Sequence, residues 1–173
     1  MTSTARSRLL AGLIDLAIVL VWALVVAGVA ALLISSGPAR GMGPLALHLI
    51  GVAVVVLPST VGLTVLEAGR YEATPGKLKY GLRVRRDPSG ERISWGRSLV
   101  RNLLKLGLPW TLGHLAVISV GSSLGVDAVI GVLASAAVPV AYVVSLLIGD
   151  GRTIYDRLAG TMVISTEPGR RFA

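Results

Sequence analysis

Four long apolar runs without charge constrain the fold of this chain more than any other feature. None of them contains Asp, Glu, Lys or Arg: Leu16–Ile34, Pro44–Leu66, Leu106–Val126 and Ala128–Ile148. A helix of about 20 apolar residues crosses a bilayer core, and in lipid each backbone polar group must be satisfied within its own segment. The sequence therefore predicts an all-α integral membrane protein of one domain, 1–173. Four transmembrane helices, arranged as two hairpins, are expected at about 9–35, 44–67, 103–125 and 127–149.

The basic residues predict the orientation of these helices. Of the 17 Lys and Arg residues, Arg40 alone lies in a connection that would face outward. The positive-inside rule then places both termini, the segment 69–101 and the tail 150–173 in the cytoplasm, which implies the plasma (inner) membrane. The net charge of +8 is concentrated beside the membrane, so we expect anionic lipid head groups, and no nucleic acid, as its partners.

The segment between spans two and three is the longest polar part of the chain. Thr74 followed by Pro75 is typical of a helix start and predicts a short helix up to Tyr80. The stretch "LRVRRDPSGERISW" predicts a small cytoplasmic β-hairpin over 81–95, with "TMVIS" at 161–165 as a candidate third strand. Four arginines of the hairpin are predicted to face lipid: Arg83, Arg85, Arg86 and Arg92.

Asp15 is a carboxylate inside the first predicted span, directly before its uncharged run, and requires a polar partner. An aspartate near the centre of a membrane helix costs about 2.5–3.5 kcal/mol on insertion scales. Arg8 lies on the same helical face, but its side chain leans toward the helix N-terminus, away from Asp15. Arg101, Asn102 and Lys105 enter span three at a comparable depth and are the expected partners. Two roles are open for Asp15: a structural clamp between spans one and three, or a proton or cation site.

A second polar motif, "GRTIYDRLAGT", follows span four. Thr153 and Asp156 have the spacing of a capping box, in which the carboxylate accepts a hydrogen bond from the N-cap amide. An ion pair between Asp156 and Arg8 is the other role open to Asp156. The predicted polar cluster near the cytoplasmic face contains Arg8, Asp15, Arg101, Asn102, Lys105 and Asp156.

The sequence gives no sign of catalysis or of a cofactor. It has no cysteine, and its two histidines, His48 and His114, lie in different predicted spans, so no metal site is predicted. The stretch "TPGK" lacks the remaining residues of a phosphate-binding loop. No nucleophile, base and acid occur together at one depth. We therefore predict a protein that is not an enzyme.

With these features in view, the chain resembles the RDD family of membrane proteins, named for one arginine and two aspartates. The resemblance rests on "RLLAGLID" at 8–15, "TPGKLKYGLRV" at 74–84, "SLVRNLL" at 98–104 and "GRTIYDRLAGTMVI" at 151–164. It assigns Arg8, Asp15 and Asp156 to the three family positions, while Tyr155 stands where histidine is frequent. It implies a membrane domain without catalytic residues. Ligand transport has been suggested for the family, with cation–proton exchange in some members and a scaffold role in others.

Two functions of different class remain open. The chain is transport-associated, acting on a small solute or on cations and protons through the polar cluster, or it is a structural or accessory subunit of a larger membrane complex. Four spans are few for alternating access, since many transporters are built from paired repeats of several helices. A transport role therefore implies a homo-oligomer or a larger membrane-protein partner.

Overall fold

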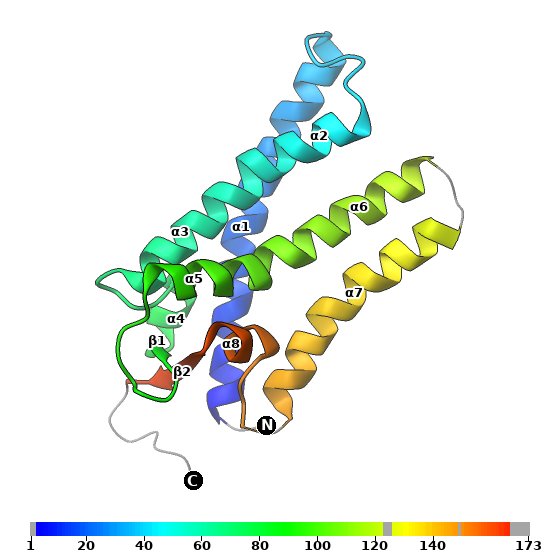
Figure 1. Cartoon of the computed structure of the whole chain (residues 1–173). Coiled ribbons are helices and arrows are strands. Elements are labelled where there is room, and N and C mark those ends of the chain that lie inside the picture. The colour runs from blue at the N-terminus through cyan, green and yellow to red at the C-terminus, as the bar shows by residue number, and fades with distance from the viewer. Residues whose placement is uncertain (1–2, 123–125, 149, 167–173) are drawn as a thin grey trace.

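The computed structural model describes residues 3–122, 126–148 and 150–166 as two helical hairpins that meet at one end (Figure 1). The first hairpin starts with α1, Ser3–Ser36. A turn leads into a second long helix made of three consecutive segments: α2 (Pro44–Gly51), the π-helical turn η1 (Val52–Val56) and α3 (Leu57–Ala68). The two arms of this hairpin run antiparallel.

The second hairpin has the same composite design in its first arm. That arm consists of α5 (Trp95–Asn102), the π-helical turn η2 (Leu103–Gly107) and α6 (Leu108–Ser122), and its second arm is α7 (Val126–Leu147). The arms approach closely where small residues meet, because a Cβ built on Gly131 would lie 3.2 Å from the Cα of Ala116. Small residues commonly permit such close approach between membrane helices.

The two π-helical turns have a local cause in the sequence. Each one ends two residues before a proline, Pro58 after η1 and Pro109 after η2. Proline lacks the N–H that would bond one turn back, and its ring collides with the carbonyl at that position. A wider turn relieves the collision, so both helices continue through their prolines.

Among the described residues, three helices are long and apolar enough to cross a membrane: Ala5–Ser36, Leu45–Ala68 and Val129–Leu147. Their surfaces are largely apolar and exposed, as at Leu24 and Leu133. These helices confirm the mainly helical, span-bearing fold predicted from the sequence. The predicted third span, 103–125, coincides with η2 and α6 and then runs into residues 123–125, outside the described part of the chain. A count of four spans stays a prediction.

The small β element is present, but its pairing differs from the prediction. β1 (Leu82–Arg86) pairs antiparallel with β2 (Thr161–Ser165), the candidate third strand, to form a two-stranded sheet. The second arm of the expected hairpin contributes only an isolated bridge between Arg85 and Arg92. The reason is local: Ser94 caps α5 by accepting a hydrogen bond from the backbone N–H of Arg97, so a helix begins where the strand would continue.

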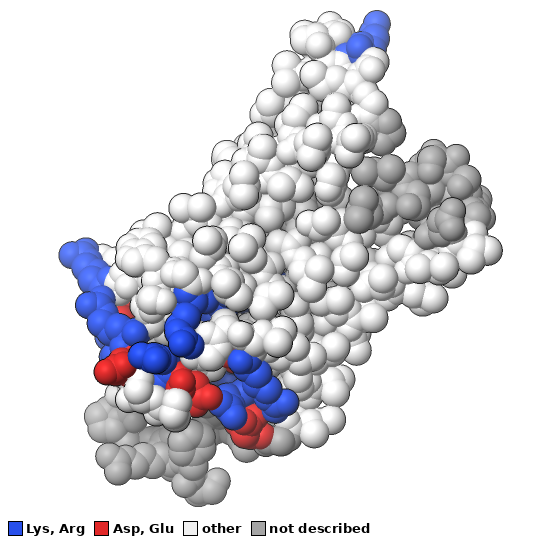
Figure 2. All heavy atoms as spheres, viewed as in Figure 1, with Lys and Arg blue, Asp and Glu red and all other residues white. Residues whose placement is uncertain are grey.

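Two short helices and the sheet cover one end of the bundle, here called the charged end. The helices are α4 (Pro75–Lys79), which packs on α1, and α8 (Ile154–Ala159), which packs on α5 and α7. Thr74 is the N-cap of α4 as predicted, although its side chain caps no helix N–H. Figure 2 shows that acidic and basic side chains gather at this end, while most of the visible surface beyond it is uncharged.

Candidate functional site

Buried charged and amide side chains from six elements meet inside the charged end. Glu67, Asn102 and Asp156 are fully buried, and Arg101 is 1% exposed. We call the whole set the ion-pair network. Its members are Arg8 and Asp15 from α1, Glu67 from α3, Lys77 from α4, Arg101 and Asn102 from α5, Lys105 from η2 and Asp156 from α8.

Arg101 lies at the centre of the network. One guanidinium nitrogen is 2.7 Å from Glu67 Oε1, and two others donate to Asp156 Oδ1 at 3.0 and 2.8 Å. The guanidinium carbon also lies 5.2 Å from the centre of the Tyr155 ring. A planar guanidinium suits this position because it can bond to two carboxylates and stack on an aromatic ring at once. Arg101 therefore ties α3 and α8 to α5.

Asp156 performs both of the roles left open by the sequence. The capping box of α8 is present, since Thr153 and Asp156 exchange side-chain and backbone hydrogen bonds. The same carboxylate also pairs with Arg8. Burial alone would raise the pKa of Asp156, but Arg101 and Arg8 hold this pKa well below its usual range. The carboxylate is therefore ionised at neutral pH.

Glu67 and Lys77 are network residues that the sequence reasoning missed. Lys77 Nζ lies 2.6 Å from Glu67 Oε1, and Asn102 Nδ2 donates to Glu67 Oε2 at 3.0 Å. One signal was available in the sequence. Glu67 is the first charged residue after the second apolar run, and Asp15 is the last charged residue before the first apolar run. Carboxylates at matching ends of antiparallel spans lie at similar depth.

Asp15 is buried, but most of its contacts come from α4 and the residue before it. Thr74 Oγ1 donates to Asp15 Oδ2 at 2.6 Å, and the backbone N–H of Gly76 donates to Oδ1 at 3.0 Å. Of its three expected partners, Lys105 is the one within ion-pair distance, at 3.7 Å, whereas Arg101 and Asn102 bond elsewhere in the network. The prediction that Asp15 contacts span three therefore holds for Lys105 alone, while Thr74 and Gly76 supply the hydrogen bonds to its carboxylate.

The docking of α4 against α1 depends on a glycine. A Cβ built on Gly76 would lie 2.1 Å from the carbonyl oxygen of Ala11 and 2.9 Å from Asp15 Oδ1. Any side chain at Gly76 would push α4 away and break the hydrogen bond to Asp15. This explains the glycine in "TPGK" without a phosphate-binding role.

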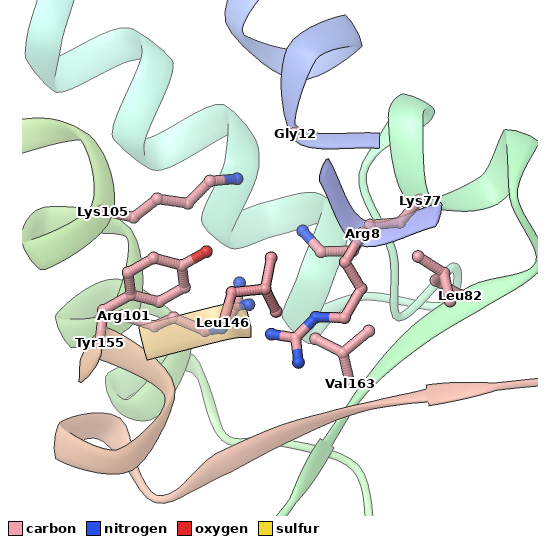
Figure 3. Close-up of a pocket in the computed structure, with 9 residues that line it drawn as sticks. All are labelled: Arg8, Gly12, Lys77, Leu82, Arg101, Lys105, Leu146, Tyr155 and Val163. Atoms are coloured by element: carbon pink, nitrogen blue, oxygen red, sulfur yellow. The ribbon is translucent and has the colours of Figure 1, made fainter. Parts of the chain in front are cut away.

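A small cavity of about 30 Å³ opens inside the network. Figure 3 shows the cationic ends of Arg8, Lys77 and Lys105 pointing toward this space, together with the Tyr155 hydroxyl. Four of the described lining residues are cations and none is acidic: the lining consists of Arg8, Gly12, Lys77, Leu82, Arg101, Lys105, Leu146, Tyr155 and Val163. We call it the basic cavity.

Lys105 differs from the other cations of the basic cavity. Arg8, Lys77 and Arg101 each donate hydrogen bonds to carboxylates. The Lys105 side chain makes no hydrogen bond within the described part of the chain, and its nearest ionic partner is Asp15 at 3.7 Å. An ammonium group has three donors, so Lys105 has capacity for a ligand that carries negative oxygens.

Three of the four predicted lipid-facing arginines surround one carboxylate. Arg85, Arg92 and Arg83 lie 2.5, 2.8 and 3.6 Å from Glu72, and Arg86 lies 3.4 Å from Glu91. Three cations around Glu72 leave an excess of positive charge on this surface. Whether these residues contact lipid stays a prediction.

The two histidines, which the sequence places in different spans, are neighbours in the structure. The ring centroids of His48 and His114 are 5.3 Å apart, and Trp110 stacks on His114 at 5.4 Å. Within the described residues, no group of three or more His, Asp and Glu side chains is arranged to hold a metal ion. The pair is therefore described here as a packing contact.

A bundle of membrane-length apolar helices, closed at one end by buried arginine–aspartate pairs, defines this class of membrane protein. We call the ion-pair network, which joins the helices at that end, the polar lock. The chain belongs to the RDD family, which its sequence matches over residues 2–160. The resemblance drawn from the sequence motifs is thus confirmed. No curated protein and no solved structure matched the chain.

Proposed function

We propose that this RDD-family chain is a transport-associated membrane protein that binds an anionic group, a phosphate or a carboxylate, at the charged end of its bundle. The observation that carries the proposal is the basic cavity, where Arg8, Lys77, Arg101 and Lys105 surround a space without an acidic neighbour in the described lining. Its volume of about 30 Å³ admits about two water-sized groups, such as the oxygens of one anionic head. The role is one of binding, not catalysis.

The charges of the network favour an anion over the cation or proton suggested as an alternative. Four cations face three carboxylates, so the network carries one excess positive charge. Asp15, Glu67 and Asp156 already accept hydrogen bonds from groups of the chain. A cation entering the cavity would meet like charges first, and like charges at close range in a buried site repel strongly.

The membrane topology is part of the proposal. We infer that the charged end and both termini face the cytoplasm, because the basic residues gather there and the first connection carries only Arg40. Since the chain has no cysteine, single cysteines can be placed at Ser36 and Ser89 without background. In sealed cells an impermeant maleimide should label Ser36→Cys and leave Ser89→Cys unlabelled. Labelling of Ser89→Cys from outside would invert the topology.

Anion binding is tested with glycerol 3-phosphate on the detergent-solubilised protein by equilibrium dialysis. We expect saturable binding that is lost in Lys105→Met and kept in Lys79→Met, a matched variant at an exposed lysine outside the cavity. Equal binding by both variants, or no saturable binding by the unmodified protein, would overturn the proposal. Exchange of labelled glycerol 3-phosphate across proteoliposomes then distinguishes a carrier from a binding subunit.

A second candidate, an accessory or scaffold subunit, is favoured by the connectivity of the network. Its ion pairs join α1, α3, α4, α5 and α8 into one block, as a rigid scaffold requires. A pull-down from native membranes tests this candidate. A larger membrane protein recovered in stoichiometric amount, with no exchange by the isolated chain, would assign the accessory role, whereas recovery of the chain as a homo-oligomer with exchange would assign transport.

A further inference from the structure

We infer that the anionic group bound at the basic cavity belongs to a bilayer lipid, whose acyl chain lies in an apolar groove between α1, α6 and α7. This inference rests on the proposed function, because it names the class of ligand that the same site takes. It commits to an anionic lipid with a small head group, such as phosphatidylglycerol. A water-soluble anion, a second copy of the chain and a partner helix are the alternatives that the experiment below distinguishes.

The groove has a volume of about 720 Å³ and is lined mainly by apolar residues. Leu9, Leu13 and Leu16 of α1 form one side of it, and Gly113 of α6 and Val143 of α7 lie on the other. The volume falls within the range of about 300–1,000 Å³ that is typical of small-molecule sites. From Leu106 to His114 the groove follows α6 for about 12 Å at the rise of a helix. This shape suits a flexible hydrocarbon chain.

The groove and the basic cavity are neighbours. Arg8, Gly12, Lys105, Leu146 and Tyr155 line both of them. We therefore infer that a single molecule places a negative head in the cavity and a tail in the groove, with these shared side chains around its middle. Arg8 and Lys105 stand at the junction, where the head group and the tail of such a molecule would be joined.

Charge, not tail length, should decide which lipid binds. Lipid tails are already in hydrocarbon, so moving one into an apolar groove gains little from the hydrophobic effect. An unpaired cation near an anionic head group contributes about 1 kcal/mol, which corresponds to about fivefold in affinity. We therefore expect phosphatidylglycerol to be enriched in the groove about fivefold over phosphatidylcholine, with little dependence on chain length.

A partner helix fits the groove less well than a lipid. A helix is about 10–12 Å wide with its side chains, and an apolar one would bring no counter-charge to Lys105 and Arg8. Covering Lys105 with an apolar helix would cost free energy, since its side chain has no hydrogen bond within the described part of the chain to compensate it. A lipid phosphate supplies that counter-charge.

The test is quenching of Trp110 fluorescence by brominated lipid in nanodiscs. Trp110 lines the groove, and the other two tryptophans are removed by Trp22→Phe and Trp95→Phe. Brominated phosphatidylglycerol diluted into phosphatidylcholine should quench Trp110 as if enriched about fivefold over its mole fraction. Lys105→Met should reduce this enrichment to the mole fraction itself. Dialysis of glycerol 3-phosphate on the same variants in detergent, where no phosphatidylglycerol competes for the cavity, reports whether the anion site is intact.

A groove-filling variant tests the position of the tail. A Cβ at Gly113 meets no atom within 4 Å, so Gly113→Leu is chosen to fill the groove, and Gly28→Leu is its matched control on α1 outside the groove. Gly113→Leu should lower the quenching of Trp110 by brominated lipid while glycerol 3-phosphate still binds. Glycerol 3-phosphate binding without any preference for phosphatidylglycerol would overturn the lipid inference and leave the proposed function standing, and loss of both would overturn both. A Trp110 that no brominated lipid quenches would mean that protein fills the groove.

Discussion

The charged end and the apolar remainder of the bundle hold their helices together in different ways. At the charged end, Arg101 bonds to Glu67 and Asp156, and Asp15 holds α4 against α1. Each of these contacts specifies one partner atom. In the apolar part, small residues let helices approach closely, as where Gly131 meets Ala116. The same region contains the groove between α1 and the second hairpin.

This difference follows from the solvent that each region meets. Apolar helices gain little from leaving lipid for one another, so packing alone specifies their arrangement weakly. Buried ions are expensive unless each finds its partner, and we expect this cost to favour one arrangement at the charged end over others. The polar lock fixes the helices at one end and leaves room between them further along. A ligand can therefore enter the groove without disturbing the lock.

Arg101→Met should cause the largest loss in the free energy of unfolding, because it removes the cation at the centre of the polar lock. The substitution leaves Glu67 and Asp156 with fewer counter-charges in a buried site. Removing one partner of a buried ion pair costs about 3–5 kcal/mol. We expect a loss of that size in the free energy of unfolding, measured by denaturant titration in detergent micelles.

Arg86→Met is the matched control for Arg101→Met. Arg86 pairs with Glu91 at the surface, where ion pairs contribute about 0–1 kcal/mol. If both variants lose the same free energy of unfolding, the charged end does not lock the bundle. A selective loss in Arg101→Met would instead establish that the buried pairs carry the specificity.

Gly76→Ala should have the next largest effect, since it removes α4 from the lock without changing any charge. Its methyl group would collide with the Ala11 carbonyl oxygen and with Asp15. Overpacking of this kind costs about 1–3 kcal/mol in the free energy of unfolding. Gly28→Ala, in open space on α1, should instead stabilise the helix slightly. Unfolding titrations of both variants in the same detergent check the contrast, and equal values would contradict the docking of α4 on α1.

The apolar part was predictable from the sequence, and the charged end was predictable only in pieces. Span position follows from apolar runs, and the capping box of α8 follows from the spacing of Thr153 and Asp156. These features depend on neighbours along the chain. The partners of Asp15 depend on the docking of α4, which is set by the space left at Gly76. Residue patterns do not encode such a space, and for that reason Glu67 and Lys77 were missed.

The sheet repeats this lesson. The turn signal at 87–90 favours a local hairpin, yet β1 pairs with β2, about 80 residues further along. Local turn chemistry reports that the chain reverses, and it does not report which strand completes the sheet. A second arm of the local hairpin is prevented by the N-cap at Ser94, because α5 begins directly after it.

The basic cavity also predicts that anion binding depends on pH, whereas the apolar part of the bundle has no such dependence to predict. Burial lowers the pKa of Lys77 to about 8, an effect that Lys105 and Arg101 reinforce and that Glu67 and Asp15 oppose. Glycerol 3-phosphate remains a dianion above pH 7. Its affinity should therefore fall as the pH rises through about 8, by about fivefold for one lost cation, measured by equilibrium dialysis from pH 7 to pH 9.

Raising the pH should change stability in the opposite direction to binding. The folded chain releases the Lys77 proton at about pH 8 and the unfolded chain at about pH 10.5. Between these values the unfolded state binds more protons, so the contribution of Lys77 to the free energy of unfolding rises with pH.

Lys77→Met is the control for the binding titration, and it should flatten the change in glycerol 3-phosphate affinity between pH 7 and pH 9. A change that persists in Lys77→Met would assign the titration to another group.

The smallest expected effect concerns the basic surface around Glu72, which borders the charged end and is outside the lock. Arg83, Arg85 and Arg92 share this one carboxylate, so part of their charge is already neutralised. Each free cation near an anionic membrane contributes about 1 kcal/mol, and salt screens it. A bimane probe on Ser89→Cys, read in nanodiscs with and without phosphatidylglycerol, should report a closer approach to the anionic surface. Replacing Arg83, Arg85, Arg86 and Arg92 by glutamine should weaken the approach, and Glu72→Gln should strengthen it because it frees three guanidinium groups. If the bimane emission does not change with phosphatidylglycerol in any of the three proteins, the basic surface is assigned to a protein partner.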